Sequence, residues 1–139
     1  MEELYEWLDS IQDYRQPAKV RHKLKDIIVI RWVSSSDIYA LFGNILDNAI
    51  EAVCSLEQPE DRSFSLSVRR IGEMTVIHQE NPYSGEIVLK DGIPQTHKQD
   101  TSYHGFGVRS IRMIAEKYSG HVALSTANQI FVLTVTLLS

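Results

Sequence analysis

"GNILDNAIEA", residues 43–52, lies in the segment with the clearest helical pattern of this chain of 139 residues. Its apolar residues recur at intervals of three and four, and the pattern continues on both sides. It predicts an amphipathic helix over residues 37–57, with "EQPED" closing it. The polar face of that helix carries Asn44 and Asn48 one turn apart. Because asparagine is a mediocre helix former, this pair needs an explanation.

Two interpretations of the asparagine pair follow from its chemistry. Any surface helix has a polar face, so the pattern by itself is also that of a solvated surface. Alternatively, an amide oxygen on a rigid helix can ligate Mg²⁺, a cation that prefers oxygen and keeps several waters while it bridges nucleotide phosphates. A second asparagine one turn earlier could then hydrogen-bond those waters or a phosphate oxygen.

The composition limits the class of protein. Hydrophobic residues at 43% and charged residues at 23% are ordinary for one globular domain. No apolar run reaches the ~20 residues of a membrane span, and the N-terminus "MEELYEWLDS" is acidic where a signal peptide is basic. The single cysteine, Cys54, agrees with a reducing compartment, and a net charge of -4 without a basic stripe argues against nucleic acid. We expect a cytoplasmic domain without nucleic-acid or membrane contact.

The residues before the asparagine helix divide into two parts. Helical spacing over residues 2–14, with a break or a fresh helical start at Pro17, predicts a helical N-terminal segment over residues 1–25, ahead of a main domain over residues 26–139. The β-branched run "IIVIRWV", residues 27–33, predicts a short strand, and "SSSD" offers N-cap residues to the helix that follows.

The residues after the helix alternate between strand, loop and helix patterns. Residues 63–71 and 73–81 alternate around Gly72, which predicts a β-hairpin. Residues 81–104 hold two prolines and two glycines without a period, which predicts a long loop. A second helix ending at Gly120 and two closing strands over residues 121–126 and 130–138 complete the domain.

A second motif, "HGFGVRS", places Gly105 and Gly107 just before that second helix. Glycine lets the main chain approach a phosphate, and the N–H groups at a helix start attract anions. A Gly-x-Gly pair is equally common as a plain turn, and without a third glycine it is no dinucleotide fingerprint. Lys98 and His104 flank this turn and could pair with β- or γ-phosphate oxygens, or simply be solvated.

The order of these motifs resembles a known family. "NILDNAIEA" resembles the N-box, and "HGFGVRSI" the second glycine box, of the GHKL ATPase superfamily, in particular the catalytic ATP-binding domain of sensor histidine kinases. "GNILDNAIEAV", "QEN", "THK…HGFGVRSI…EKYSGHV" and "FVLTVTLL" look most like the Agr-type peptide-sensing kinases. The resemblance covers residues 37–138.

The resemblance implies a fold and a set of ligands. The fold would be the Bergerat type, an α/β two-layer sandwich whose mixed, mostly antiparallel sheet has helices on one face. The cofactors would be ATP and Mg²⁺, with Asn48 as the metal ligand and Asn44 beside it. ATP-hydrolysing relatives carry a Glu where this chain has Asn44, and an amide cannot act as a general base. Because a neutral imidazole needs no base, the resemblance implies phosphoryl transfer to histidine, with no catalytic residue in this chain.

The first glycine box departs from the family pattern Asp-x-Gly-x-Gly, since the matching stretch is "NPYSG". Asn81 would accept the adenine amino proton in place of the Asp, and Gly85 keeps the last glycine. Tyr83 replaces the middle glycine, a departure that bears on adenine affinity and on the shape of the adenine pocket. The closing strand also lacks the common Gly-Thr before Phe131.

The implied function is to bind Mg-ATP and donate the γ-phosphate to a histidine on a separate dimerisation domain of the same kinase, with a response regulator as the indirect partner. Such a chain would be inactive alone, and could be the soluble part of a membrane-bound sensor. His22 in "VRHKLKD" lies too close to the N-box for an acceptor hairpin, and we expect it on a helix surface. The alternatives are a nucleotide-binding module without kinase activity and a GHKL ATPase or serine kinase.

Overall fold

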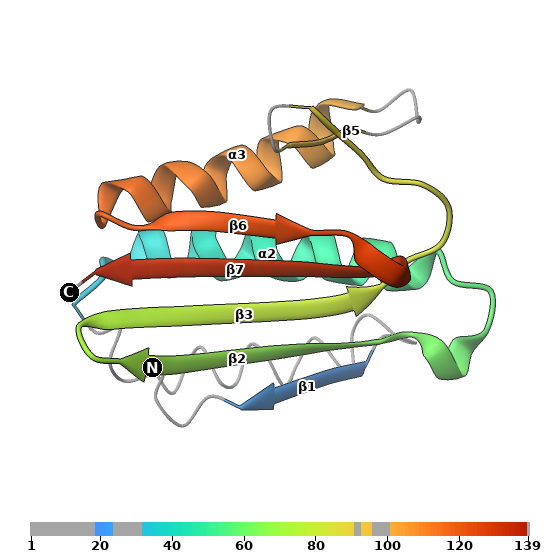
Figure 1. The fold of residues 1–139 in the computed structure, drawn as a ribbon, viewed down its shortest axis with the longest axis horizontal. Coiled ribbons are helices and arrows are strands. Elements are labelled where there is room, and N and C mark those ends of the chain that lie inside the picture. The colour runs from blue at the N-terminus through green and yellow to red at the C-terminus, as the bar shows by residue number, and fades with distance from the viewer. Residues whose placement is uncertain (1–18, 24–31, 91–92, 96–100, 139) are drawn as a thin grey trace.

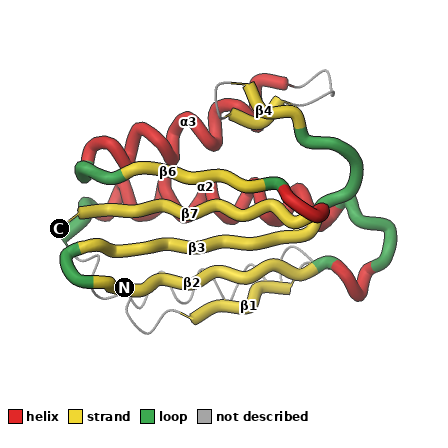
Figure 2. Tube along the Cα trace, in the orientation of Figure 1, coloured by secondary structure: helices red, strands yellow, loops and turns green. Residues whose placement is uncertain are grey.

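Two helices cover one face of a five-stranded sheet in the computed structural model (Figure 1; Figure 2). The structure describes residues 19–23, 32–90, 93–95 and 101–138, with side chains over residues 32–87 and 107–138. The helices are α2 (Ser35–Cys54) and α3 (Thr101–Lys117). This arrangement confirms the predicted α/β two-layer sandwich. No helix in the described ranges is long and apolar enough to cross a membrane.

The sheet is mixed and mostly antiparallel, as predicted. Its order is β1-β2-β3-β7-β6, with β1 and β2 parallel and every other neighbouring pair antiparallel. β3 lies at the centre and pairs with β7 along its whole length, from Met74 opposite Leu138 to Pro82 opposite Ile130. The strands are β1 (Lys19–Lys23), β2 (Ser63–Ile71), β3 (Met74–Pro82), β6 (His121–Ser125) and β7 (Ile130–Leu138).

The asparagine-bearing helix α2 forms as its sequence predicts. Ser34 is the N-cap, and its hydroxyl oxygen accepts a hydrogen bond of 3.2 Å from the Asp37 backbone N–H. The helix ends at Cys54, somewhat earlier than predicted, and a 3₁₀ turn follows at Pro59–Asp61. Its apolar stripe is buried against the sheet: Ile38, Leu41, Phe42, Ile45, Leu46, Ala49, Ile50 and Val53.

The strands behave as their alternation predicts. β2 and β3 form the expected hairpin, and Gly72 in its turn has a φ of +62°, a left-handed conformation that suits glycine. On β7, the predicted core face is buried at Phe131, Leu133, Val135 and Leu137. The core therefore lies between the helices and this single face of the sheet.

The predicted helical segment over residues 1–25 is wrong for the part that the structure describes. Residues 19–23, expected as helix, form strand β1, which runs parallel to β2 and places His22 opposite Leu66. Without β1, strand β2 would be an edge with unpaired N–H and C=O groups, so pairing outweighs the local pattern. The helix predicted for residues 2–14 and most of the predicted strand at 27–33 lie outside the described residues, and Trp32 and Val33 are in a turn.

The loop predicted for residues 81–104 is only partly a loop. It contains a small hairpin of β4 (Val88–Lys90) and β5 (Ile93–Gln95), in which Lys90 pairs with Ile93. The two intervening residues are Asp-Gly in the sequence, a strong two-residue hairpin signal. Helix α3 also begins earlier than predicted, at Thr101.

The end of α3 is a Schellman motif that uses an unexpected residue. Ser119 N–H donates to Glu116 O at 3.0 Å and Gly120 N–H to Ala115 O at 2.8 Å. The left-handed residue is therefore Ser119, with a φ of 58°, and not the predicted Gly120. Gly120 is needed for another reason, because a Cβ there would lie 1.6 Å from the Thr136 carbonyl oxygen of β7.

Candidate functional site

The two sequence motifs meet where α3 packs against α2. A Cβ built on Gly107 would lie 3.0 Å from Asn48 Oδ1 and 3.3 Å from Asn48 Nδ2. Both distances are tighter than most real Cβ contacts, so a larger residue at position 107 would require the Asn48 amide to shift by a few tenths of an ångström. The second glycine box and the N-box are thus brought to one place, with the Asn48 amide held half-buried between the helices.

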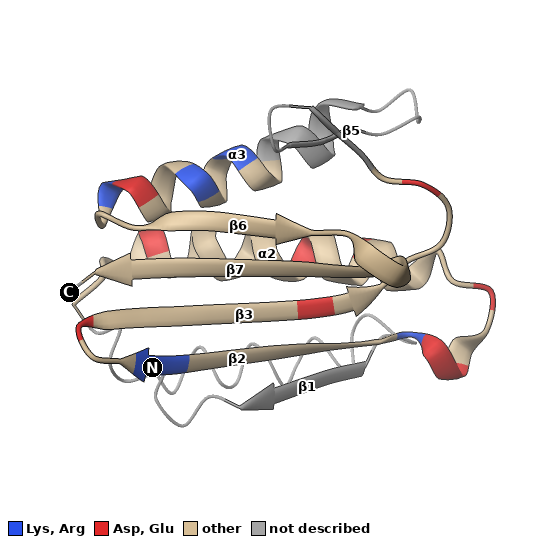
Figure 3. Ribbon diagram, in the orientation of Figure 1, with Lys and Arg blue, Asp and Glu red and all other residues tan. Residues whose placement is uncertain are grey.

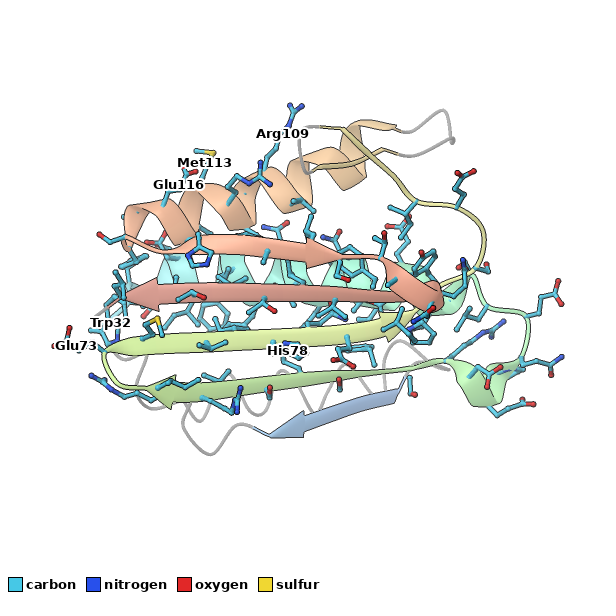
Figure 4. The ribbon with its side chains drawn as sticks, viewed as in Figure 1. Trp32, Glu73, His78, Arg109, Met113 and Glu116 are labelled. Carbon is cyan, nitrogen blue, oxygen red and sulfur yellow. The ribbon has the colours of Figure 1, made fainter. Side chains whose placement is uncertain are left out.

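The side of α3 that faces α2 is buried and nearly free of charge. Gly107, Val108, Ile111 and Ala115 are buried, whereas Arg109, Met113 and Glu116 point away from the sheet (Figure 4). Basic residues outnumber acidic ones along the described part of this helix, with Arg109, Arg112 and Lys117 against Glu116, and few charges lie on β3, β6 and β7 (Figure 3). The Asn48 amide therefore lies on the side of α3 that is partly shielded from solvent, where dissolved salt screens an ionic contact less than at the open surface.

Asn44 lies one turn before Asn48 on α2 and is also half-buried. Its Nδ2 donates a hydrogen bond of 2.8 Å to the Ala40 carbonyl oxygen, four residues earlier on the same helix. This bond fixes the amide with its oxygen directed away from Ala40 O. The pair of amides thus keeps the spacing expected of a metal ligand and a neighbouring hydrogen-bonding group.

The third predicted element, Asn81, lies at the end of β3 on the buried face and is 1% exposed. Its Oδ1 accepts a hydrogen bond of 2.8 Å from Gln79 Nε2, and its Nδ2 donates one of 3.0 Å to Pro82 O. Sequence reasoning missed Gln79. The available signal was that Gln79 shares the core-facing positions of β3 with Ile77, where an apolar residue is expected.

Tyr83, which stands in place of the family's middle glycine, lies in the hydrophobic core. It is 8% exposed, its hydroxyl donates to Thr126 O at 2.8 Å, and its N–H donates to Gln129 O at 3.2 Å. Gly85, with a φ of +85°, follows in an exposed turn. With its amide nitrogen facing them, the Gln129 side chain donates to Gly85 O and Tyr83 O at 3.2 and 3.1 Å. The corner after Asn81 is therefore tied to the start of β7.

The predicted phosphate-binding residues are placed differently from the prediction. Because α3 begins at Thr101, both Gly105 and Gly107 lie inside the helix and not in a turn before it. The N–H groups without an intrahelical partner are then those of the first helical turn. The residues "DTS" at 100–102 are typical N-terminal residues of a helix and account for the early start. The side chain of His104 and all of Lys98 lie outside the described part of the structure.

The far ends of α2 and α3 are joined by a polar cluster that sequence reasoning did not find. Asp37 Oδ2 accepts hydrogen bonds from Lys117 Nζ at 2.8 Å and from the Tyr118 hydroxyl at 2.5 Å. These donors, Lys117 first, lower the pKa of Asp37 from 3.8 to about 2, and the carboxylate in turn raises the pKa of Lys117.

Further contacts complete this cluster around Tyr118. The Ser34 N–H donates to the Tyr118 hydroxyl at 3.1 Å, and the Trp32 ring meets the Tyr118 ring edge-on at 5.3 Å between centroids. The cluster holds the start of α2 against the end of α3. It therefore fixes the antiparallel register in which Asn48 meets Gly107.

The residues present suit a magnesium ion held with a nucleotide. Among the described residues no group of three or more His, Cys, Asp or Glu is placed to hold a metal by itself. A Mg²⁺ ion that keeps its waters and binds phosphate oxygens needs only one or two oxygen ligands from protein, and the Asn48 amide is of the right kind.

Residues 33–138 match the GHKL domain family, and the chain belongs to that family. No curated protein matches it. Among solved structures, a nucleotide-free catalytic domain of histidine kinase ThkA is similar, with a TM-score of 0.65 at 13% identity over 99% of this chain and 90% of that one. Histidine kinase AdeS of Acinetobacter baumannii is also similar, with a TM-score of 0.61 at 15% identity over 97% of this chain.

These likenesses show the fold, which is that of histidine kinase catalytic domains. The chain spans 62% of the AdeS chain it matches. The expected GHKL membership is therefore confirmed, while the closer likeness to Agr-type kinases stays a prediction.

Proposed function

We propose that this chain is the ATP-binding catalytic domain of a sensor histidine kinase. The observation that carries the proposal is the contact of Asn48 with Gly107, which joins the N-box to the second glycine box. Membership of the GHKL family and the likeness to histidine kinase catalytic domains support it. The Agr-type assignment and the cytoplasmic location belong to the same proposal.

Each residue of the site would have its own role in binding Mg-ATP. Asn48 would supply the protein ligand to Mg²⁺, with Asn44 beside it on the same helix. Asn81 would meet the base at the end of β3, with Gly85 next to it, and Gly105, Gly107, Lys98 and His104 would border the phosphates. When bound, Mg²⁺ neutralises charge on the phosphates, which together with positioning supplies most of the catalysis in phosphoryl transfer.

Asn44 favours a histidine acceptor over water or serine. Its amide nitrogen is engaged with Ala40 O, and its oxygen cannot take up a proton at neutral pH. A general base is typically worth ~10²–10⁴-fold in rate. The ATPase and serine kinase alternatives therefore lack the group they need at this position.

The acceptor histidine would belong to a separate dimerisation domain. His22 lies in strand β1, opposite Leu66 of β2, and a strand in a sheet does not present a histidine as a helical hairpin does. A response regulator would then be the indirect partner. The competing candidate, a nucleotide-binding module without transferase activity, is favoured by the altered first glycine box, in which Asn81 stands in place of the family's Asp and Tyr83 in place of a glycine.

Titration calorimetry with ATP, with and without Mg²⁺, tests the proposal. We expect the parent chain to bind ATP more tightly with Mg²⁺, and Asn48→Ala to lose that dependence on Mg²⁺ while keeping its fold. The matched control is Asn128→Gly, which alters an exposed asparagine whose φ of 58° suits glycine. If Asn48→Ala responds to Mg²⁺ as the parent does, the metal assignment is wrong.

A further inference from the structure

Gln79 carries a buried acceptor that the fold leaves without a donor. The residue is 0% exposed on β3, the central strand of the sheet (Figure 1), and its Oε1 has no hydrogen-bond partner among the described residues. An unpaired buried carbonyl oxygen destabilises a fold, because it loses its bond to water and gains none. The buried Oε1 of Gln79 therefore raises the question of which group donates a hydrogen bond to it.

The neighbouring amide shows which kind of donor fits. Gln79 Nε2 donates to Asn81 Oδ1, and Asn81 Nδ2 donates to Pro82 O, so both nitrogens are engaged. Asn81 Oδ1 still has one free lone pair, because an amide oxygen has two. The pair therefore offers two acceptor oxygens at the end of β3, close in sequence to the exposed turn at Ser84 and Gly85.

We propose that Gln79 is a base-reading residue, whose Oε1 accepts a hydrogen bond from the exocyclic amino group of a 6-aminopurine while Asn81 Oδ1 accepts the other. This inference rests on the proposed function, since it requires an adenine nucleotide at the site. An amino group has two N–H donors, and the amide pair offers two acceptors. The base thus satisfies the oxygen that the fold leaves unpaired.

The same inference accounts for the departure of Asn81 from the family pattern. An aspartate at this position offers two carboxylate oxygens, whereas an asparagine offers one. Gln79 supplies the second acceptor two residues earlier on the same face of the strand. A purine without an amino group at position 6 gains nothing from either oxygen.

The experiment compares ATP with purine riboside triphosphate, which lacks the 6-amino group, by calorimetry on the parent and on Gln79→Met. The parent should bind ATP at least about tenfold more tightly than the purine analogue, as expected for two net hydrogen bonds. Gln79→Met should lose about 3- to 10-fold in ATP affinity, as for one net hydrogen bond. Its affinity for the purine analogue should not change.

Two further variants test whether Gln79 acts as the second acceptor. Thr75→Val is the matched control, because Thr75 Oγ1 is likewise buried and unpaired among the described residues on the same face of β3, and its loss should change neither affinity. In an Asn81→Asp background the carboxylate offers the second oxygen itself. There Gln79→Met should cost less ATP affinity than it costs in the parent.

Several results would overturn the inference. An unchanged ATP affinity in Gln79→Met, an equal loss for both nucleotides, a loss that is just as large in the Asn81→Asp background, or an equal loss in Thr75→Val would each refute it, while ATP binding by the parent leaves the proposed function standing. If Gln79→Met does not fold, equal affinity of the parent for the two nucleotides still refutes the base contact. A parent that binds no ATP refutes both proposals.

Discussion

Asn48 on α2 and Gly107 on α3 approach so closely that a Cβ at position 107 would lie 3.0 Å from the Asn48 amide oxygen. The contact joins the two motifs that resemble the N-box and the second glycine box. It depends on the register of two antiparallel helices, which the cluster of Asp37, Lys117 and Tyr118 fixes at their far ends.

Gly107→Ala should weaken Mg-ATP binding without unfolding the protein. Alanine is the better helix former by ~1 kcal/mol, so α3 itself should not suffer. The added methyl group has to displace the Asn48 amide, and we expect a loss of at least about tenfold in affinity, or about 1.4 kcal/mol. Calorimetry measures the affinity, with Ser110→Ala on the same helix as the control. Unimpaired binding by Gly107→Ala would show that the Asn48 amide is not used.

Asp37 should make stability depend on pH in the acid range. Its pKa is lowered from 3.8 to about 2 in the folded chain, so its contribution is present above about pH 4 and is lost as the pH falls towards 2. Asp37→Asn should therefore be less stable than the parent at neutral pH, and the difference should shrink between pH 4 and pH 2. Thermal midpoints over this range measure it.

The control for this pH dependence is Asp61→Asn, which changes an exposed aspartate in the 3₁₀ turn. Its difference from the parent should stay small throughout. A gap between Asp37→Asn and the parent that does not narrow on acidification would contradict the role of the Lys117 and Tyr118 hydrogen bonds.

Two neighbouring substitutions in the turn after α3 should change the stability of the protein in opposite directions. Gly120→Ala places a Cβ against the Thr136 carbonyl oxygen and should destabilise the protein by about 1–3 kcal/mol or more. Ser119→Gly removes a side chain from a left-handed residue and should stabilise it by up to about 1 kcal/mol. Urea denaturation gives both values, and destabilisation by Ser119→Gly would refute the assignment of the cap.

How far the sequence predicts this fold depends on whether a segment is shaped by its own pattern or by its neighbours. Helix α2, the β2–β3 hairpin and strand β7 each have one buried face, and periodicity alone predicts them. Strand β1 is different, because its five residues become a strand by pairing with the edge of β2.

The candidate site likewise contains residues that the sequence predicts and residues that it does not predict. Asn48, Asn81 and Gly107 are visible in the motifs, and the structure brings Asn48 and Gly107 together. The role of Gln79 could not be predicted, because it depends on which face of β3 is buried. The contact between Asp37 and Tyr118 could not be predicted either, because these residues lie far apart in the chain. The start of α3 differs from the prediction, because a Gly-x-Gly pair is typical of a turn, whereas the helix already begins at Thr101 and includes both glycines.

Tyr83→Phe should lower stability and leave nucleotide affinity unchanged. The change removes the hydrogen bond from the hydroxyl to Thr126 O and should cost about 1 kcal/mol. Because the ring lies in the core, Tyr83 should not contact ATP. Denaturation and calorimetry on the same samples check both expectations, and a clear loss of ATP affinity would place Tyr83 in the nucleotide site after all.

Phosphate transfer to histidine distinguishes a histidine kinase catalytic domain from a nucleotide-binding module without transferase activity. The parent chain is mixed with radiolabelled ATP, Mg²⁺ and a purified histidine-bearing dimerisation domain, and acid-labile phosphate on that domain is measured together with free phosphate. We expect labelled acceptor with the parent, none with Asn48→Ala, and negligible phosphate release by the chain alone. Binding of ATP without any transfer to acceptor domains, or rapid hydrolysis by the chain alone, would contradict its assignment as the catalytic domain of a histidine kinase.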